Sequence, residues 1–367
     1  MTRRQQVLLT DKGTLQRDWP YTRARFEQRL ADTADITFVD VNETDLVTLD
    51  WASFDAVALL GGELDATILA RAQRLAVVGG MTDVRGPSCF HLLCARNIPF
   101  IDGTPAWAQS VAECGFGLIL SALRRLPHWH RSLANGSCDW KYAYGQFCDD
   151  PAFVNGSLAS KTVGVVGMGQ IGSRLATWCT TIGAQVLAHD PFAPVSRFTD
   201  AGATAHDLDA LLDAVDILVV AVPPTPSADR MINAERIARL RQGAIVATMT
   251  RTAALDVDAL RTRVLANEIF WTTDVYDTEP LPANDPILGR GNVVHLPHIA
   301  GRTRDSNICL ADILADDFIR VFAGDPPRHA LTPEAVNVRT NIEPGQEQIL
   351  ASRPSSRAHA AGPHAQP

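Results

Sequence analysis

The feature that most constrains the fold is a repeated alternation of short apolar runs with longer amphipathic segments. Such runs lie at 54–61, 74–80, 162–167, 184–190, 216–223, 244–249, 270–276 and 292–297. They lack the polar alternation of a half-exposed strand, so they predict strands that are covered on both faces. The segments between them have the length of crossover helices. The pattern therefore predicts an α/β fold built from doubly wound parallel sheets.

The length of the chain predicts two such units with a cleft between them, because 367 residues exceed one ordinary core. One unit covers residues 1–102, to which a helix within 299–337 returns, and the other covers 103–298. A long helical stretch at 110–134 lies near the join. Residues 338–367 are rich in Ser, Pro, Ala and Gly and are predicted to be disordered.

Composition argues against several classes of partner and site. The net charge of −8 gives no reason to expect nucleic acid or an anionic membrane rather than a small molecule. No apolar run approaches the roughly 20 residues that span a bilayer, and the N-terminus lacks a signal-peptide pattern. The seven cysteines form no CxxC pair, so we expect free thiols in a reducing cytoplasm and no metal site.

A glycine-rich turn follows one of the apolar runs. Gly167, Gly169 and Gly172 form a GxGxxG pattern between an expected strand and an expected helix, and Asp190 ends the next strand. The first glycine permits a tight turn, the second lets the backbone approach a pyrophosphate, and the third lets the helix pack on the strand. Asp190 is suited to bind ribose hydroxyls and to repel a 2′-phosphate, which favours NAD(H). Arg197 would soften that preference if its loop folded back.

Three ionisable residues follow the ends of consecutive expected strands. Arg251 follows the run at 244–249, Glu279 follows the strand that leads to Asp274, and His298 follows the last run. Each alone has a structural explanation, as a surface charge, a loop acid or a solvated histidine. Ligands of open α/β sheets bind beyond the carboxyl ends of the strands. Together the three therefore predict a functional site.

The segment 162–303 resembles the NAD-dependent D-isomer-specific 2-hydroxyacid dehydrogenases. The matching pieces are KTVGVVGMGQIG, VPPTPSADRMI, GAIVATMTR with VDAL, DVYDTEPLP and NVVHLPHIAGRT. Upstream, RLAVVGG, NIPFID and SVAE are similar to landmarks of the family's first domain, so the resemblance covers roughly 55–330. It implies a flavodoxin-like substrate domain, a Rossmann NAD-binding domain and a homodimer formed partly by 110–134.

The resemblance also implies roles in hydride transfer between NAD(H) and a small anionic 2-hydroxy or 2-keto acid. His298 would exchange the proton of the reacting hydroxyl, and Glu279 would bind its far ring nitrogen and stabilise the imidazolium. Arg251 would fork to the carboxylate of the substrate. Asp274 would bind the nicotinamide carboxamide. The further cofactor contacts that it implies are Gln170, Ile171, Pro223 and Thr250.

Departures from the family pattern concern the substrate. Thr252 stands where the family usually has Gly, and GGMTDVRGPS at 79–88 replaces a GxGxD-like loop. Arg85 in that loop is predicted to contact an anionic group of the substrate, with exposure to solvent as the alternative. Trp107, where Asn is frequent, would narrow or cap the pocket or else belong to the core. These changes suggest an unusual acid, and a phosphonate or phosphite-type anion is an open alternative.

A second class of function stays open at this point. A non-catalytic NAD(H)-sensing regulatory protein of the same fold would also keep Arg251, Glu279 and His298. A formate-dehydrogenase-like enzyme is disfavoured, because that branch carries Gln at the position of Glu279.

Overall fold

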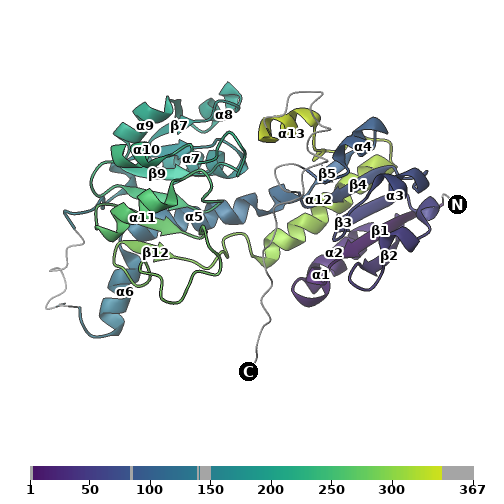
Figure 1. Ribbon diagram of the computed structural model, residues 1–367, viewed down its shortest axis with the longest axis horizontal. Coiled ribbons are helices and arrows are strands. Elements are labelled where there is room, and N and C mark those ends of the chain that lie inside the picture. The colour runs from purple at the N-terminus through teal and green to yellow at the C-terminus, as the bar shows by residue number, and fades with distance from the viewer. Residues whose placement is uncertain (1–2, 83–85, 139, 141–149, 341–367) are drawn as a thin grey trace.

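The computed structural model describes residues 3–82, 86–138, 140 and 150–340. Each of two lobes contains one parallel sheet, and the lobes are joined by α5 and by the segment before α12 (Figure 1). The predicted disordered tail falls mostly on 341–367, which lie outside the described residues. Its first residues, 338–340, instead belong to the helix α13 (Pro333–Thr340).

The first lobe holds a five-stranded sheet in the order β2-β1-β3-β4-β5, with every pair parallel. This is the flavodoxin-like order, as predicted. The strands are β1 (Gln5–Asp11), β2 (Ala34–Asp40), β3 (Ala56–Leu60), β4 (Val77–Gly80) and β5 (Phe100–Asp102). The helices are α1 (Thr14–Arg17), α2 (Pro20–Leu30), α3 (Ala66–Arg71) and α4 (Phe90–Ala95), with 3-10 turns η1 (Leu46–Thr48), η2 (Trp51–Ser53) and η3 (Thr104–Trp107).

The second lobe holds a seven-stranded parallel sheet in the order β12-β11-β10-β9-β6-β7-β8. The order reverses between β6 and β9, as it does in a Rossmann fold. The strands are β6 (Thr162–Val166), β7 (Gln185–His189), β8 (Thr204–Ala205), β9 (Ile217–Val220), β10 (Ile245–Thr248), β11 (Phe270–Thr273) and β12 (Val293–His295). The helices are α7 (Gln170–Ile182), α8 (Val195–Asp200), α9 (Leu208–Ala214), α10 (Ala234–Arg239) and α11 (Val257–Leu265), with η4 (Leu158–Ser160).

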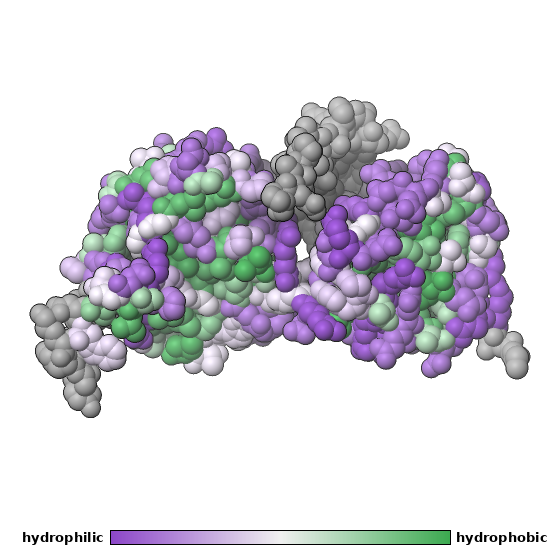
Figure 2. Space-filling view, turned by 90° about the horizontal axis from the view of Figure 1, so that it is seen from below, coloured by the Kyte–Doolittle hydropathy of each residue, from purple (hydrophilic) through white to green (hydrophobic). Residues whose placement is uncertain are grey.

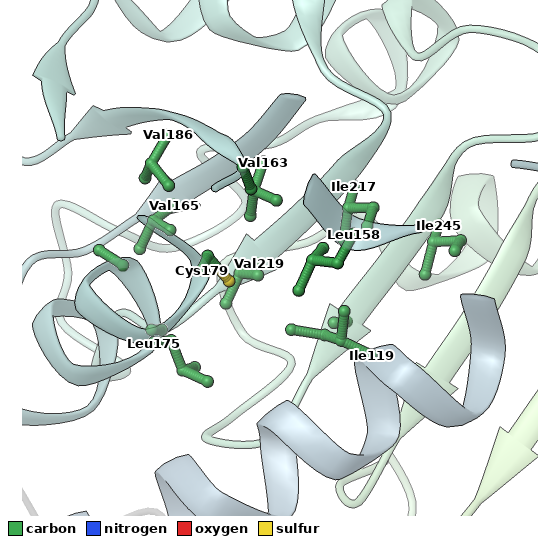
Figure 3. Close-up of a cluster of buried hydrophobic side chains, with 14 of the residues drawn as sticks. Ile119, Leu158, Val163, Val165, Leu175, Cys179, Val186, Ile217, Val219 and Ile245 are labelled. Carbon is green, nitrogen blue, oxygen red and sulfur yellow. The ribbon is translucent and has the colours of Figure 1, made fainter. Parts of the chain in front are cut away.

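Both faces of the seven-stranded sheet are buried, which explains the unbroken apolar runs. In β9, Ile217 and Val219 point into the cluster on one face, and Leu218 and Val220 point into the cluster on the other. Figure 3 shows the first of these clusters, where side chains from the strands meet Ile119 of α5 and residues of α7. The two-residue period of a strand therefore feeds two hydrophobic layers at once.

The chain passes between the lobes through helices. The stretch predicted as one helix at 110–134 is two, α5 (Ala108–Leu123) and α6 (Leu126–Ala134). They are separate because Arg125 adopts a left-handed φ of +52°, which ends the first helix. The helix α12 (Arg304–Phe322) packs against α2, and its residue Phe318 is fully buried in a core cluster of the first lobe.

One helical stretch of the described residues, Thr104–Leu123, is long and apolar enough to cross a membrane by length and composition alone. Half of its most apolar window is buried inside the protein. There α5 packs against α7 and the strands β10 and β11, so the apolar character of this helix is explained by the core.

Candidate active site

The carboxyl ends of the parallel strands bring most of the predicted residues to one edge of the seven-stranded sheet. Six strands of that sheet lie side by side in register with parallel directions, so the loops that follow them leave from the same edge. The residues that follow these strands closely are Gly167, Asp190, Pro223, Thr250, Arg251, Asp274 and His298. This edge is where open α/β sheets bind ligands.

Each glycine of the turn has its own structural reason. Gly167 has a φ of +95°, and a Cβ there would lie 2.9 Å from the carbonyl of Ala221. A Cβ at Gly172 would lie 1.8 Å from the carbonyl oxygen of Gly167. A Cβ at Gly169 would meet nothing within 4 Å. The protein's own packing therefore requires the first and third glycines. The second faces open space, where a pyrophosphate could approach the protein backbone.

The first turn of α7 presents unsatisfied N–H groups beside that open space. Gly169 is the N-cap of this helix and provides no side-chain cap, and Gln170 and Ile171 form the first turn. Uncapped N–H groups at a helix start, together with the helix dipole, favour an anion such as a pyrophosphate.

Asp190 lies directly against the glycine turn. Its Oδ2 accepts the backbone N–H of Met168 at 2.7 Å, and its Oδ1 accepts those of Phe192 and Ala193 at 2.9 and 3.1 Å. Arg197 does fold back, because its Nη1 donates to the carbonyl of Met168 at 3.2 Å. The carboxylate and the guanidinium are therefore bound to the two ends of the same residue.

His298 and Glu279 form a pair. The Nδ1 of His298 lies 2.6 Å from Oε2 of Glu279, and both side chains are 33% exposed. The other oxygen of Glu279 accepts the backbone N–H of Tyr276 at 2.8 Å, which fixes the carboxylate. With Nδ1 directed at a carboxylate, Nε2 is the ring nitrogen left for a ligand.

Asp274 holds the backbone that carries His298. It is 1% exposed, and its oxygens accept the N–H groups of Ile299 and Ala300 at 2.8 and 2.9 Å. His298 has a φ of +55°, a left-handed conformation that is costly for a residue with a Cβ. The two bonds to Asp274 over-determine this conformation. Each oxygen of Asp274 thus already accepts one backbone N–H group. The contact of Asp274 with the nicotinamide carboxamide stays a prediction.

Arg251 is exposed at the end of β10, and its Nη1 donates to the carbonyl of Thr250 at 2.7 Å rather than to the histidine pair. The hydroxyl of Thr250 lies 3.4 and 3.3 Å from the carbonyls of Val220 and Val222, which ties the end of β10 to that of β9. Pro223 follows directly.

The two residues predicted to contact substrate from the first lobe have different outcomes. Arg85 lies outside the described residues. Trp107 is half-buried, and its ring centroid lies 6.4 Å from that of Trp19. A Cβ at Gly301, three residues after His298, would lie 3.1 Å from the Trp107 ring. The sequence analysis did not predict that Trp19 would contact Trp107. The available signal was the position of Trp19 just before Pro20, which starts α2 and so places Trp19 in a loop.

A cluster of hydroxyl groups joins the two crossings between the lobes. The hydroxyl of Ser110 on α5 lies 2.9 Å from that of Thr303 and 2.6 Å from that of Ser306, which begin α12. The helix that enters the second lobe is thereby bonded to the helix that returns to the first, a few residues from His298.

Among the described residues, no group of His, Cys, Asp or Glu side chains is arranged to hold a metal ion. The six described cysteines form no disulfide. Burial raises the pKa of the Cys179 thiol to about 12 and that of Cys89 to about 11. These thiols are neutral core groups rather than nucleophiles.

Comparison with known proteins decides the family. The family described as "D-isomer specific 2-hydroxyacid dehydrogenase, NAD binding domain" matches residues 116–300. A glyoxylate reductase from Thermofilum pendens is 30% identical over 301 residues, which cover 77% of this chain and 82% of that protein. The chain belongs to the D-isomer-specific 2-hydroxyacid dehydrogenase family. The resemblance inferred from the motifs is thereby confirmed, and NAD is the cofactor of the matched domain.

One further relative by sequence and one solved structure are also similar to this chain. A D-3-phosphoglycerate dehydrogenase from Archaeoglobus fulgidus is 29% identical over 78% of this chain, and the chain spans about half of its length, 52%. A solved phosphoglycerate oxidoreductase from Rhizobium etli has a TM-score of 0.76 at 21% identity and covers 91% of this chain and 100% of its own. The latter likeness shows that the fold predicted from the sequence is correct.

Proposed function

We propose that this dehydrogenase-family chain transfers hydride between NAD(H) and a small anionic 2-hydroxy or 2-keto acid. The observation that carries the proposal is the 2.6 Å contact of His298 with Glu279, at the same sheet edge as the glycine turn. The pair favours an enzyme, and because an NAD(H)-sensing protein of the same fold would also keep these residues, turnover decides between the two functions. We also propose that 1–102 with 299–337 hold the substrate and that 103–298 hold the cofactor.

The residues present fit NAD(H). Gly169 leaves room for the pyrophosphate, the first turn of α7 supplies N–H donors, and Asp190 stands where the adenosine ribose would lie. When bound, the nicotinamide supplies the hydride acceptor or donor, and the protein supplies geometry and electrostatics. Gln170, Ile171, Pro223 and Thr250 line the same edge and are assigned to cofactor contacts.

His298 moves the proton in this proposal. Its Nδ1–H donates to Glu279, which leaves Nε2 to accept the proton of the substrate hydroxyl during oxidation and to return it during reduction. Glu279 stabilises the imidazolium that forms, and the N–H of Tyr276 keeps its carboxylate in place. This arrangement couples a mobile proton to a fixed negative charge.

Arg251 binds the acid group of the substrate. Its guanidinium is exposed at the carboxyl end of β10, and toward the residues that the structure describes it donates one hydrogen bond, to the carbonyl of Thr250, which would be kept or exchanged when a carboxylate binds. A planar guanidinium suits a carboxylate by two parallel hydrogen bonds, and it also suits a phosphonate. Arg85 and Trp107 are assigned to the substrate side of the pocket.

The experiment that tests the function follows NADH consumption with a panel of 2-keto acids that includes phosphonate analogues. We expect turnover with one class, and His298→Ala should lower kcat by about 10²–10⁴-fold. The control is Thr303→Ser, which keeps the hydroxyl of the interlobe cluster and should leave kcat unchanged. If the wild-type chain binds NADH and turns over no member of the panel, the enzyme proposal loses to the NAD(H)-sensing alternative.

We also propose that the chain forms a homodimer through α6 and its surroundings. Leu126 and Leu133 of this helix are 53% and 56% exposed, and Trp140 beyond it is 58% exposed. No residue of α6 is buried. Large apolar side chains gathered on one element favour a protein contact. Sedimentation that compares the mass of the wild-type protein with that of the double variant Leu126→Asp/Leu133→Asp tests this dimer.

We also propose that the protein is located in the cytoplasm.

A further inference from the structure

Three apolar side chains follow the carboxyl ends of strands in the first sheet. Trp19 comes after β1 and the short helix α1, Met81 comes directly after β4, and Trp107 comes after β5 at the end of η3. All three pack on the same core cluster of the first lobe but are only half-buried, so each keeps an accessible apolar surface. We call these three side chains the apolar wall. Because the strands of this sheet are parallel, the wall lies at the edge where such sheets bind ligands.

Trp107 of the apolar wall lies against the segment that carries His298. A Cβ at Gly301 would lie 3.1 Å from Cδ1 and 3.5 Å from Cβ of Trp107, so the glycine lets the indole approach this backbone closely. The hydroxyl of Ser110, three residues after Trp107, lies 2.9 Å from that of Thr303. In Figure 2 the lobes meet at a narrow waist with a hollow beside it. Trp107 therefore lies where the first lobe meets the residues that follow the histidine.

Trp19 contacts Trp107 and is held there by its surroundings. The centroids of the two ring systems are 6.4 Å apart and their planes are tilted by 48°. The carbonyl of Trp19 accepts the N–H of Thr22 at 2.9 Å, at the start of α2. The hydroxyl of Tyr21 in the same turn accepts a hydrogen bond from Nδ2 of Asn307 on α12 at 3.3 Å. The backbone that carries Trp19 is therefore bonded to the helix that follows the histidine segment.

The apolar wall contributes no charged group. The cation nearest to Trp19 in the chain, Arg17, already makes two hydrogen bonds of 2.9 Å to Asp18. Ile299, the residue after His298, adds a large apolar side chain that is 46% exposed. A carboxylate placed against such surfaces would lose hydration without gaining a partner, whereas a hydrocarbon chain would gain from leaving water. These surroundings therefore favour an apolar group.

We propose that Trp19 determines substrate specificity by positioning Trp107, and that the apolar wall receives the side chain of the substrate. In the proposed function the acid group binds Arg251 of the second lobe, which leaves the first lobe to contact the rest of the molecule. The substrate class is then a 2-keto or 2-hydroxy acid with a hydrocarbon side chain, rather than one with a second anionic group. The inference rests on the proposed function, since it requires turnover of a 2-keto acid.

The test compares kcat/KM for 2-ketovalerate, 2-ketoglutarate and glyoxylate at saturating NADH. The first two have carbon chains of equal length that end in a methyl group or in a carboxylate, and glyoxylate has no side chain. We expect wild-type kcat/KM to be about tenfold or more higher for 2-ketovalerate than for 2-ketoglutarate. Trp19→Ala should lower the ratio of kcat/KM for 2-ketovalerate to that for glyoxylate about tenfold, mainly through a higher KM for 2-ketovalerate. Trp19→Phe keeps an aromatic ring and should restore most of this ratio.

Trp178→Ala is the matched control, because it also removes a half-buried tryptophan from an aromatic pair. Its partner is Phe116 in the second lobe, with ring centroids 5.8 Å apart. This variant should leave the ratio of the two kcat/KM values unchanged. Since both values come from one preparation, a loss of folded protein cancels in the ratio.

Three results would overturn the inference. The wild-type protein could prefer 2-ketoglutarate to 2-ketovalerate, Trp19→Ala could lower kcat/KM equally for 2-ketovalerate and glyoxylate, or Trp178→Ala could change their ratio as much as Trp19→Ala does. A wild-type protein that turns over no 2-keto acid contradicts the proposed function itself, and the inference falls with it.

Discussion

A Cβ on residue 172 would lie 1.8 Å from the carbonyl oxygen of Gly167, so the turn and the helix after it touch backbone to backbone. Gly172→Ala should therefore lower the stability of the second lobe by about 1–3 kcal/mol or more, which lowers Tm by roughly 2–4 °C per kcal/mol. Calorimetry or thermal circular dichroism measures this.

Gly169→Ala is the counterpart, because its Cβ would meet nothing within 4 Å of the protein. We expect an unchanged Tm and a Kd for NADH raised about tenfold or more, since the methyl group would occupy the space of the pyrophosphate. A loss of Tm equal to that of Gly172→Ala would contradict this division of roles between the two glycines.

The pair of His298 and Glu279 predicts a non-additive double-mutant cycle. Glu279→Gln removes the charge that stabilises the imidazolium and should lower kcat by about 10–100-fold, with little change in the Kd for NADH. Because Glu279 acts through His298, the double variant with His298→Ala should be no slower than His298→Ala alone. Multiplying effects would mean that Glu279 acts on the substrate independently.

Asp274 provides a test of positioning. Asp274→Asn replaces one acceptor by an NH₂ group that faces the N–H of Ile299 or Ala300, so one of the two backbone bonds is lost. A buried donor left without a partner costs about 1–3 kcal/mol. We expect a lower Tm and a lower kcat, because the left-handed backbone of His298 loses support. An unchanged kcat with a lowered Tm would assign Asp274 a purely structural role.

His295 makes stability depend on pH. Burial lowers the pKa of this histidine below its ordinary 6.5, and an interaction with the backbone of Ile287 opposes only part of that shift. As the pH falls through 6.5, the histidine becomes protonated in the unfolded chain but stays neutral in the folded chain. The free energy of unfolding therefore decreases as the pH falls. Urea unfolding at several pH values should show this decrease, and His295→Gln should reduce it. An equal decrease in the variant would assign it to other groups.

The cysteines predict an order of chemical labelling. Cys94 and Cys309 are exposed, whereas Cys179 is fully buried and its thiol has its pKa raised to about 12. A thiol reagent should label the exposed pair in the folded protein and Cys179 only after unfolding. Peptide mass spectrometry identifies the sites. Early labelling of Cys179 would show that α7 opens locally.

The strands that could be predicted are those that feed two hydrophobic layers. Every run from 54–61 onward corresponds to a strand, because both faces of those strands are buried. Among the strands that left no such run, β2, β5 and β8 lie at an edge of their sheet, whereas β1 is central and buried but has only the short apolar stretch Val7–Leu9. The edge strand β2 has exposed and half-buried residues along its length, and β8 is two exposed residues. Such strands are specified by pairing with a neighbour rather than by their own composition.

The strand-end residues of the site were also predictable, since topology alone sends parallel strands to one edge. What the residues contact there was not. The bonds of Asp274 to Ile299 and Ala300, the reach of Arg197 to Met168 and the packing of Trp19 on Trp107 depend on loop conformations. Residue type and spacing carry no information about which way a loop turns, so these contacts required the structure.

The position of α12 has a consequence for the order in which the protein matures. This helix covers one face of the first sheet with Leu310, Leu314 and Phe318, yet it is made after the whole second lobe. During synthesis one apolar face of the N-terminal strands is therefore uncovered until α12 has been made. The second lobe can fold before that, because its strands and helices are contiguous in the chain. The last helix then covers that face and completes the core of the first lobe.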